Sequence, residues 1–476
     1  LLSSGNTVDQ REQMDLQADL LARSVDNILP LLGNFHVNDR ELLASLDMEL
    51  VRIITLYITG YDAPLLKSGI AEAYVALSAI DSSLAPYFES PAQKDSIEYY
   101  LSAGRQYLQK HPDFDAFNRL FFITGYALPV QEYLNRLVNA AAGEQTVFPV
   151  LNSRAKNLFS PDAFNRAAFP GMEEADSLLV RLGKELFFEK GLSVDYSRNC
   201  ATCHSPGAAF TDRLPRNKAI DNRADLPRNT PSLLYAGFQY AQFWDGRSGS
   251  LEEQASAVLN NRHEMGASEA VIAKRLQGNP GYLASFRKIW PGDEAVAFRH
   301  VTSALSAYVA TLSPFQSAFD RYIQGNRAAM PAEAQRGFNL FMGKALCGTC
   351  HFAPLFNGLL PPEYRSTEFE VLGTPAGDNL ENPRADTDQG RHDFFPIARY
   401  EGAFKTPTVR NAAVTAPYMH NGRFGSLEKV IEFYDKGGGV GLGLKVSNQS
   451  LSDVPLQLSG QEKSDLLAFI KALTDK

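Results

Sequence analysis

Asn-Cys-Ala-Thr-Cys-His (199–204) and Leu-Cys-Gly-Thr-Cys-His (346–351) are the two stretches that decide how this chain is organised. Each is a Cys-x-x-Cys-His motif, in which two thiols form thioethers with one haem while the adjacent imidazole binds its iron. The two copies use all four cysteines of the chain. A zinc site would need four nitrogen or sulfur ligands close together, and neither stretch has a further Cys or His at short spacing. The sequence therefore predicts two covalently bound c-type haems, with Cys200, Cys203, Cys347 and Cys350 as the thioether residues and His204 and His351 as iron ligands.

Composition and charge narrow the class of protein. The chain has 476 residues, of which 44% are hydrophobic and 21% charged, as expected for a globular protein of several domains. It has no run of 18 apolar residues, so no membrane-spanning helix is expected. Residues 1–150 carry 19 Asp and Glu against 10 Lys and Arg, a net charge of −9; the total of −8 leaves +1 for the remainder. This distribution does not favour nucleic-acid binding.

The haem motifs also predict a cellular location. Thioether-linked haem is assembled outside the cytoplasm, so we expect an exported, periplasmic protein. The sequence begins at Leu1 rather than Met, which we interpret as removal of a leader. A lipid anchor upstream of Leu1 is compatible with this interpretation.

Residues 1–150 are expected to form a separate helical domain of unassigned role. Apolar residues recur at helical spacing in five segments, which are interrupted near prolines such as Pro30 and joined by short connections. Such a pattern favours an antiparallel bundle. We assign no role to its two histidines, His36 and His111. The predicted helices are 8–28, 39–59, 65–84, 93–109 and 115–142, and a linker is expected at about 143–170.

The rest of the chain contains two copies of one module. Residues 245–253 and 421–429 are identical at six of nine positions. A Thr-Pro pair precedes the shared glycine by the same distance in both copies, since Pro231 stands 15 residues before Gly246 and Pro407 stands 15 before Gly422. The second copy carries about 29 extra residues within 359–399. The predicted fold is mostly α, with cytochrome c-like haem domains at 160–330 and 331–476 after the N-terminal helical bundle.

Local signals place helices around the motifs. A helix at 176–190 leads into the first motif, and the similar segments 183–187 and 337–341 occupy equivalent places in the two modules. Ser250 and Glu253 predict a capping box at the start of the next helix. A final helix at 459–473 has an apolar stripe that should pack on a module.

The duplication indicates where the two haem sites differ. A haem iron bound by one His transfers electrons when a side chain fills its sixth position, and reacts with peroxide or oxygen when that position is open. Twelve residues after the shared glycine lies Val258 in the first module and Tyr434 in the second, and only the tyrosine can bind iron. Between Cys203 and Arg262 the sequence has no Met and no His other than His204. We therefore expect an open position at the first haem.

Two polar residues near that open position are candidates for catalysis. Cleavage of an O–O bond needs a group that takes a proton from the inner peroxide oxygen and returns it to the departing one. Glu264 is the candidate for this group, Gln254 is a candidate for orienting peroxide, and His263 is the alternative acid–base residue. A solvent-exposed helix face with no catalytic role is the competing interpretation.

From residue 176 to the C-terminus, the sequence resembles the bacterial di-haem cytochrome c peroxidase family, which includes MauG. The motifs that carry the resemblance are Leu186-Phe187, the two haem motifs, residues 228–231, 243–247, 251–254, 264–266, 406–407 and 417–422. It implies that hydrogen peroxide is reduced at the first haem with electrons delivered through the second, and that Gln254 and Glu264 lie in the peroxidatic pocket. Trp244 is expected to relay electrons between the haems. The resemblance also implies one calcium ion, held by Asn229 and the carbonyl oxygens of Thr415 and Pro417.

The residue in the sixth position of the second haem differs between branches of the family. The sixth position holds Met in the ordinary peroxidases and Tyr in MauG, and here it falls on Tyr434, with Met419 as the competing ligand. The tryptophan that MauG has six residues before its second haem histidine is Ala345 in this chain. The sequence therefore leaves two electron sources open. One is a small redox protein, such as a cytochrome c or copper protein, and the other is a protein substrate whose side chain is oxidised. A third alternative is an electron-transfer protein with both haems closed.

Overall fold

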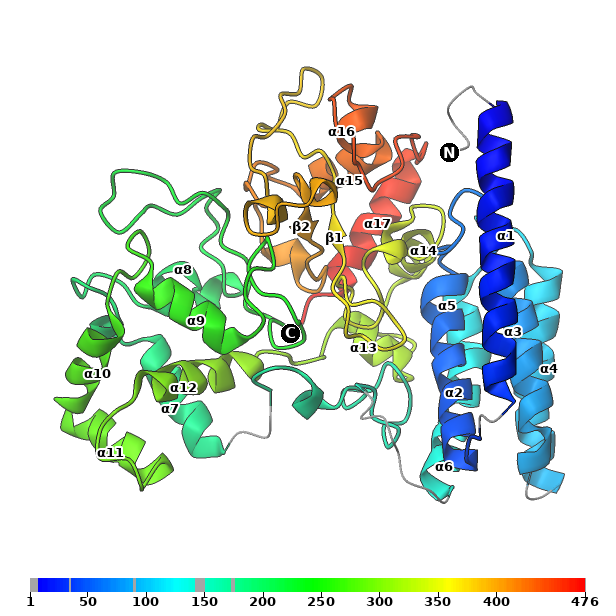
Figure 1. Ribbon diagram of the computed structural model, residues 1–476, viewed down its shortest axis with the longest axis horizontal. Helices are drawn as coiled ribbons and strands as arrows, with labels where there is room; N and C mark the ends of the chain where they lie inside the picture. Colours follow the sequence, from blue (N-terminus) through cyan, green and yellow to red (C-terminus); the bar gives the residue numbers. More distant parts are fainter. Residues whose placement is uncertain (1–6, 34–35, 89–90, 142–149, 173–175, 476) are drawn as a thin grey trace.

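The computed structural model describes residues 7–33, 36–88, 91–141, 150–172 and 176–475. Its regular structure in these ranges is mostly helical, and the strands are β1 (Phe369–Glu370) and β2 (Phe404–Lys405), which pair antiparallel. Figure 1 shows a helical bundle at one end of the molecule, the first Cys-x-x-Cys-His region at the other and the second between them. No described helix is both long and apolar enough to cross a membrane.

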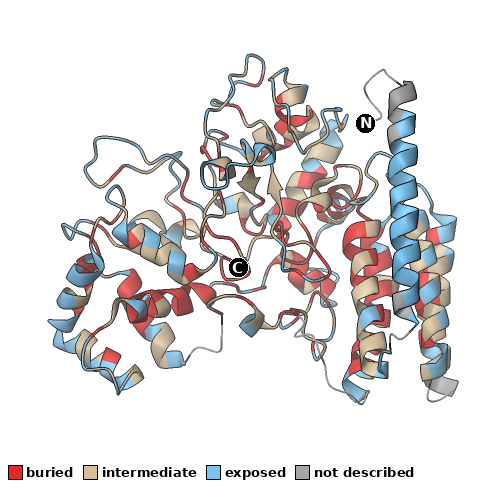
Figure 2. Cartoon of the chain, viewed as in Figure 1, coloured by how far each residue is buried: buried red, intermediate tan, exposed pale blue. Residues whose placement is uncertain are grey.

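The N-terminal helices form at the predicted places. They are α1 (Thr7–Leu32), α2 (Asp39–Arg52), α3 (Gly69–Leu84), α4 (Pro91–Lys110), α5 (Arg119–Phe122) and α6 (Leu128–Ala140). Two segments, Ile53–Tyr57 and Ile123–Ala127, are π-helical. The expected break near Pro30 is present, since α1 includes Pro30 and ends at Leu32, two residues later. Figure 2 shows α1 almost wholly exposed, whereas α2, α3 and α6 bury one face against each other.

The predicted linker, at about 143–170, is in part a packed segment of the fold. Residues 142–149 lie outside the described ranges, but the part from Val150 onward packs on α6. The backbone N–H of Leu158 donates to Oε1 of Gln131 (2.8 Å), and Nδ2 of Asn135 donates to the carbonyl of Ala155 (3.1 Å). Leu158 and Ala155 are buried in the same core as the helices. This segment is therefore part of the folded structure.

Each haem module is built on a pair of crossing helices. α7 (Ser177–Phe187) packs on α12 (Phe298–Ala310), and α14 (Ala332–Phe341) packs on α17 (Gly460–Ala472). At Gly183 on α7, an added Cβ would collide with the carbonyl of Ala304. At Gly337, the equivalent position of the second module, it would collide with the carbonyl of Asp465. The repeated glycine thus permits the same close helix crossing in both modules.

The helices that follow the repeated Gly-Ser-Leu-Glu sequence begin at equivalent serines. Ser250 caps α9 (Leu251–Asn260), and Ser426 caps α15 (Leu427–Asp435), each through its side-chain oxygen. The predicted capping box at Ser250 is only half formed. The Glu253 carboxylate accepts the N–H of Gly249 (2.8 Å), so it is not free to bond the N–H of Ser250.

The second module's insertion ties the two modules together. Arg228 in the first module makes a two-point ion pair with Asp388 in the insertion, with Nε to Oδ2 at 2.7 Å and Nη2 to Oδ1 at 2.8 Å. The N–H of Lys405, on β2, donates to the carbonyl of Trp244 (2.7 Å). These bonds position both haem motifs around a shared space.

Candidate haem and peroxide site

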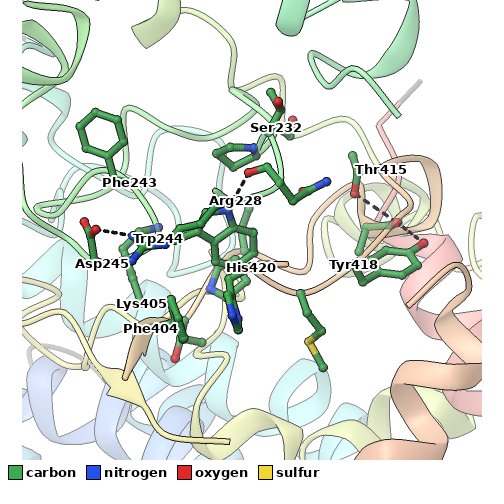
Figure 3. A pocket seen from close by; sticks show the side chains of 18 of the residues that line it. Arg228, Ser232, Phe243, Trp244, Asp245, Phe404, Lys405, Thr415, Tyr418 and His420 are labelled. Carbon is green, nitrogen blue, oxygen red and sulfur yellow. Dashed lines mark hydrogen bonds and ion pairs between the residues drawn. The ribbon is translucent and has the colours of Figure 1, made fainter. Parts of the chain in front are cut away.

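A cavity of about 1200 Å³ lies between the two modules and is lined by both Cys-x-x-Cys-His motifs. This volume exceeds the roughly 300–1,000 Å³ that is usual for small-molecule pockets, as expected for a space that holds more than one cofactor. Figure 3 shows Trp244 between Phe243 and Asp245 of the first module and Thr415 and Tyr418 of the second.

The first motif presents a histidine suited to iron. Residues Cys200–Cys203 form the short helix α8, and His204 follows it. Nδ1 of His204 donates to the carbonyl of Phe210 (3.1 Å), which leaves Nε2 free to bind iron. Burial lowers the pKa of His204, so the imidazole is neutral, as ligation requires.

The second motif repeats this arrangement. Nδ1 of His351 donates to the carbonyl of Pro407 (2.9 Å), and burial lowers the pKa of His351 to about 4. Both histidines therefore have the same tautomer and the same free nitrogen. In the second module the acceptor is thus the proline of the Thr-Pro pair, whereas in the first module it is Phe210.

The four cysteines form no disulfide with one another. Burial raises the pKa of Cys200 and Cys347 to about 12 and that of Cys203 to about 11, so they are not reactive thiolates of a dithiol redox site. Within the described residues, no group of three His, Cys, Asp or Glu side chains could hold a metal ion. The residues present therefore fit thioether-linked haem.

On the first module's side, the cavity is lined by Gln254, Val258 and Glu264. Oε1 of Glu264 accepts a hydrogen bond from Nδ2 of Asn261 (2.8 Å), which orients the carboxyl. Burial is the largest influence on Glu264 and raises its pKa. The alternative residue, His263, is exposed, accepts a bond from Arg262 and is not part of the cavity wall. Glu264 and Gln254 thus both line the cavity, and His263 lies outside it.

On the second module's side, Tyr434 and Met419 both line the cavity and pack in one apolar cluster with Phe424 and Phe433. Burial raises the pKa of Tyr434 well above its usual range, and the thiols of Cys350 and Cys347 raise it further. Tyr434 therefore lies close to the second haem motif. A phenol bound to iron would lose its proton, as metal ligands do.

Trp244 bridges the two sides. Its Nε1 donates to the carbonyl of Asn229 (2.9 Å), and its own carbonyl accepts the N–H of Lys405. Its ring therefore has a fixed place in the cavity wall.

Several polar residues of the cavity wall were not predicted. Asp245 is fully buried and bonds both Arg228 and Arg247, the latter from Nη1 at 2.7 Å. His420 is buried, stacks on Phe404 with ring centroids 3.7 Å apart and contacts Asp386. The repeated Asp/Asn-Gly-Arg sequence was the signal for Asp245, and no local signal marks the stack on Phe404.

Lys405 is a cation of the cavity wall whose side chain bonds a neutral partner. Its Nζ donates to Oε1 of Gln239, and none of the ion pairs of the described residues involves it. Burial lowers its pKa to about 8. A buried cation without a counter-charge is costly, and a haem propionate would supply that charge. The positive charge of Lys405, which has no ion-pair partner among the described residues, is thus a second observation that fits haem in this cavity.

The three proposed calcium ligands also reach this region. Asn229, Thr415 and Pro417 line the cavity, and the N–H of Asn229 donates to the carbonyl of His420 (2.7 Å). Nδ2 of Asn229 donates to the carbonyl of Leu214 (2.8 Å), which leaves its Oδ1 for another partner. These oxygen donors suit a hard cation, although none of them is charged.

Comparisons with known proteins agree with this arrangement. Residues 177–328 match the family model described as di-haem cytochrome c peroxidase. The methylamine utilization protein MauG of Methylorubrum extorquens is 38% identical over 62% of this chain and 77% of its own length. The cytochrome-c peroxidase IdrP2 of Denitromonas iodatirespirans is 31% identical over 64% of this chain and 84% of its own.

Comparison of the fold with solved structures gives relatives of the same kind. The crystal structure of a MauG-like protein associated with microbial copper homeostasis superposes with a TM-score of 0.56 at 30% identity, and covers 64% of this chain and 92% of that one. The predicted mostly helical fold with two haem c sites is therefore confirmed. The chain belongs to the di-haem cytochrome c peroxidase and MauG family and is an oxidoreductase that acts on peroxide.

Proposed function

We propose that the protein reduces hydrogen peroxide at the first haem with electrons that arrive through the second haem. The observation that carries this proposal is the place of Glu264, a carboxyl that lines the cavity on the side of the first motif beside Gln254. When bound, the haem supplies an iron that accepts and transfers electrons. Residues 160–330 then form the peroxidatic domain and residues 331–476 the electron-transfer domain.

Glu264 moves the proton that O–O cleavage requires. Its carboxylate takes a proton from the inner oxygen of peroxide and returns it to the outer oxygen, which leaves as water. The Gln254 amide donates a hydrogen bond that holds peroxide in place. In total, one peroxide takes up two electrons and two protons and yields two waters.

Electrons reach the first site by way of Trp244. Its indole lies in the cavity wall between the modules and donates to the carbonyl of Asn229, while its backbone carbonyl accepts the N–H of Lys405. Tyr434 binds the second iron in this proposal and so reserves that site for electron transfer. A small redox protein, a cytochrome c or copper protein, is the proposed donor.

A second candidate function is the oxidation of a protein side chain by peroxide. Tyr434, rather than a methionine, in the sixth position of the second haem favours it, and so does the similarity to MauG. Steady-state turnover of peroxide with reduced cytochrome c separates the two functions. Sustained turnover supports the peroxidase. Negligible turnover, together with a long-lived oxidised spectrum, supports side-chain oxidation.

The ferric haem spectrum of the same protein, with and without peroxide, tests whether the protein is only an electron carrier. Two low-spin ferric haems and no spectral response to peroxide would contradict both enzymatic proposals. A high-spin first haem that responds to peroxide supports an open sixth position.

We also propose a calcium ion at Asn229, Thr415 and Pro417. Metal analysis after dialysis against a chelator, followed by addition of calcium or magnesium, tests it. Calcium should be recovered in the wild type and lost in Asn229→Ala, while Asn135→Ala, which alters a buried asparagine of the N-terminal domain, should keep it. Equal calcium content in the two variants would contradict the assignment.

The location is proposed from the cofactor chemistry. Covalent haem attachment supports an exported, periplasmic protein, with a lipid anchor as a further possibility. Cell fractionation of the full-length gene product, with haem staining, tests this location.

A further inference from the structure

One loop of the N-terminal domain lies directly on the second haem motif. The loop follows the π-helical segment Ile53–Tyr57 and precedes α3. A Cβ on Gly348, inside the motif, would lie 3.4 Å from the methyl group of Thr59. The ring of Tyr61 packs edge-on against Phe352, which follows His351, with ring centroids 5.4 Å apart. Pro64 lines the haem cavity itself.

Specific bonds hold the loop in this place. Arg119 is fully buried, and its guanidinium donates to the carbonyl of Ile58 (2.6 Å) and to that of Phe114 (2.7 Å). An added Cβ at Gly343, just before the second motif, would collide with Arg119. Next to it, Oδ1 of Asn339 accepts the N–H of Leu120 (2.9 Å). Figure 1 shows the corresponding helices, α5 and α14, side by side.

The surroundings of Tyr61 belong to the second haem site. Burial raises the pKa of Tyr61 to about 12, and the charges of Glu368 and Asp62 raise it further. The phenol is therefore protonated at rest and lies near carboxylates. Tyr61 is half-buried at this edge of the N-terminal domain.

We propose that Tyr61 is a redox-active residue that donates an electron to the second haem when no external donor is bound, an inference that rests on the proposed peroxidase function. Hydrogen peroxide is the oxidant. The Tyr61 phenol loses one electron and one proton and becomes a neutral tyrosyl radical. The electron passes to the second haem and then by way of Trp244 to the peroxide site, and the proton passes to the Glu368 carboxylate.

The balance of this step is complete. Each peroxide needs two electrons and two protons to form two waters, and Tyr61 supplies one of each, with the proton exchanged through Glu368 and solvent. Because no external donor is bound, the haem pair itself supplies the other electron and stays oxidised by that one electron until a donor reduces it, while solvent supplies the second proton. The N-terminal helical domain thereby acquires a function at the second haem, where it supplies an internal reductant.

Electron paramagnetic resonance of the full-length holoprotein, frozen after addition of peroxide without a donor, tests the proposal. A radical signal that narrows when the protein contains ring-deuterated tyrosine is expected. The signal should be lost in Tyr61→Phe, which keeps the ring contact with Phe352. It should persist in Tyr57→Phe, a neighbouring tyrosine of the same domain whose hydroxyl donates to Glu49 (2.9 Å).

The outcomes separate this inference from the proposed function. If peroxide changes the haem spectrum but Tyr61→Phe keeps the tyrosyl signal, or the wild type has none, the role of Tyr61 is overturned and the peroxidase proposal stands. If peroxide changes nothing, both are overturned. Glu368→Gln should slow formation of the signal, and an unchanged rate would overturn Glu368 as the proton acceptor.

Discussion

The indole nitrogen of Trp244 donates a hydrogen bond to the backbone carbonyl of Asn229, 2.9 Å away. Asn229 in turn donates its own N–H to the carbonyl of His420 in the second module. The tryptophan is therefore connected through one residue, Asn229, to the opposite haem domain. Its ring is held at the boundary between the two modules.

Replacement of Trp244 by Phe should slow the transfer of electrons between the haems, because it removes both the indole and its bond to Asn229. Steady-state oxidation of reduced cytochrome c by peroxide should fall, while the first reaction with peroxide in stopped-flow absorbance keeps its rate. Trp290→Phe is the matched control, since Trp290 stacks on His300 away from the cavity. Equal turnover in the two variants would contradict a relay through Trp244.

Glu264→Gln should slow O–O cleavage by about 10²–10⁴-fold, the usual contribution of general acid–base catalysis. The amide keeps the shape of the side chain but cannot accept the proton. Stopped-flow mixing with peroxide measures the rate. Glu253→Gln, on the exposed side of α9, should react like the wild type. A wild-type rate in Glu264→Gln would show that a group other than Glu264 performs the acid–base step.

The pH dependence of the same step should reveal Glu264. Burial raises its pKa above the ordinary glutamate value. The carboxylate form accepts the proton, so the rate should be constant at high pH and fall as pH drops through the raised pKa. The fall should begin at a higher pH than for an exposed Glu and be absent in Glu264→Gln. A profile that is flat down to the ordinary glutamate pKa would contradict the assignment.

Tyr434→Phe should change the ferric absorption and magnetic circular dichroism spectra of the second haem, because the proposed oxygen ligand is lost. Met419→Leu should leave them unchanged. Both side chains lie in one apolar cluster, so the two substitutions perturb the same surroundings. The opposite pattern of spectra would make Met419 the ligand.

Gly183→Ala and Gly337→Ala should each destabilise the holoprotein by about 1–3 kcal/mol, the typical cost of overpacking. An added methyl group would meet the backbone carbonyl of the crossing helix, which cannot move aside without separating the helices. Denaturant unfolding monitored by circular dichroism measures the change. Gly460→Ala is the control, since nothing lies within 4 Å of its added Cβ. Equal stability of all three variants would show that the crossings can relax.

The local features of this protein were predictable because their signals lie within a few residues of one another. The haem motifs combine thiols and imidazole in one short stretch, and the helices show apolar residues at helical spacing. Local prediction failed where neighbouring groups compete. The Glu253 carboxylate bonds Gly249 and not Ser250, a choice that depends on the path of the chain before α9.

By itself, the sequence determined the two haem attachment sites, the duplication, the helical character and the family. Only the tertiary structure decided which groups share the cavity: that Glu264 faces it and His263 does not, that Asp388 of the insertion bonds Arg228, and that Tyr61 meets Phe352. The reason is physical. Residues far apart in the chain are brought together by the burial of whole helix faces and by the pairing of buried charges, and no short stretch of sequence encodes such contacts.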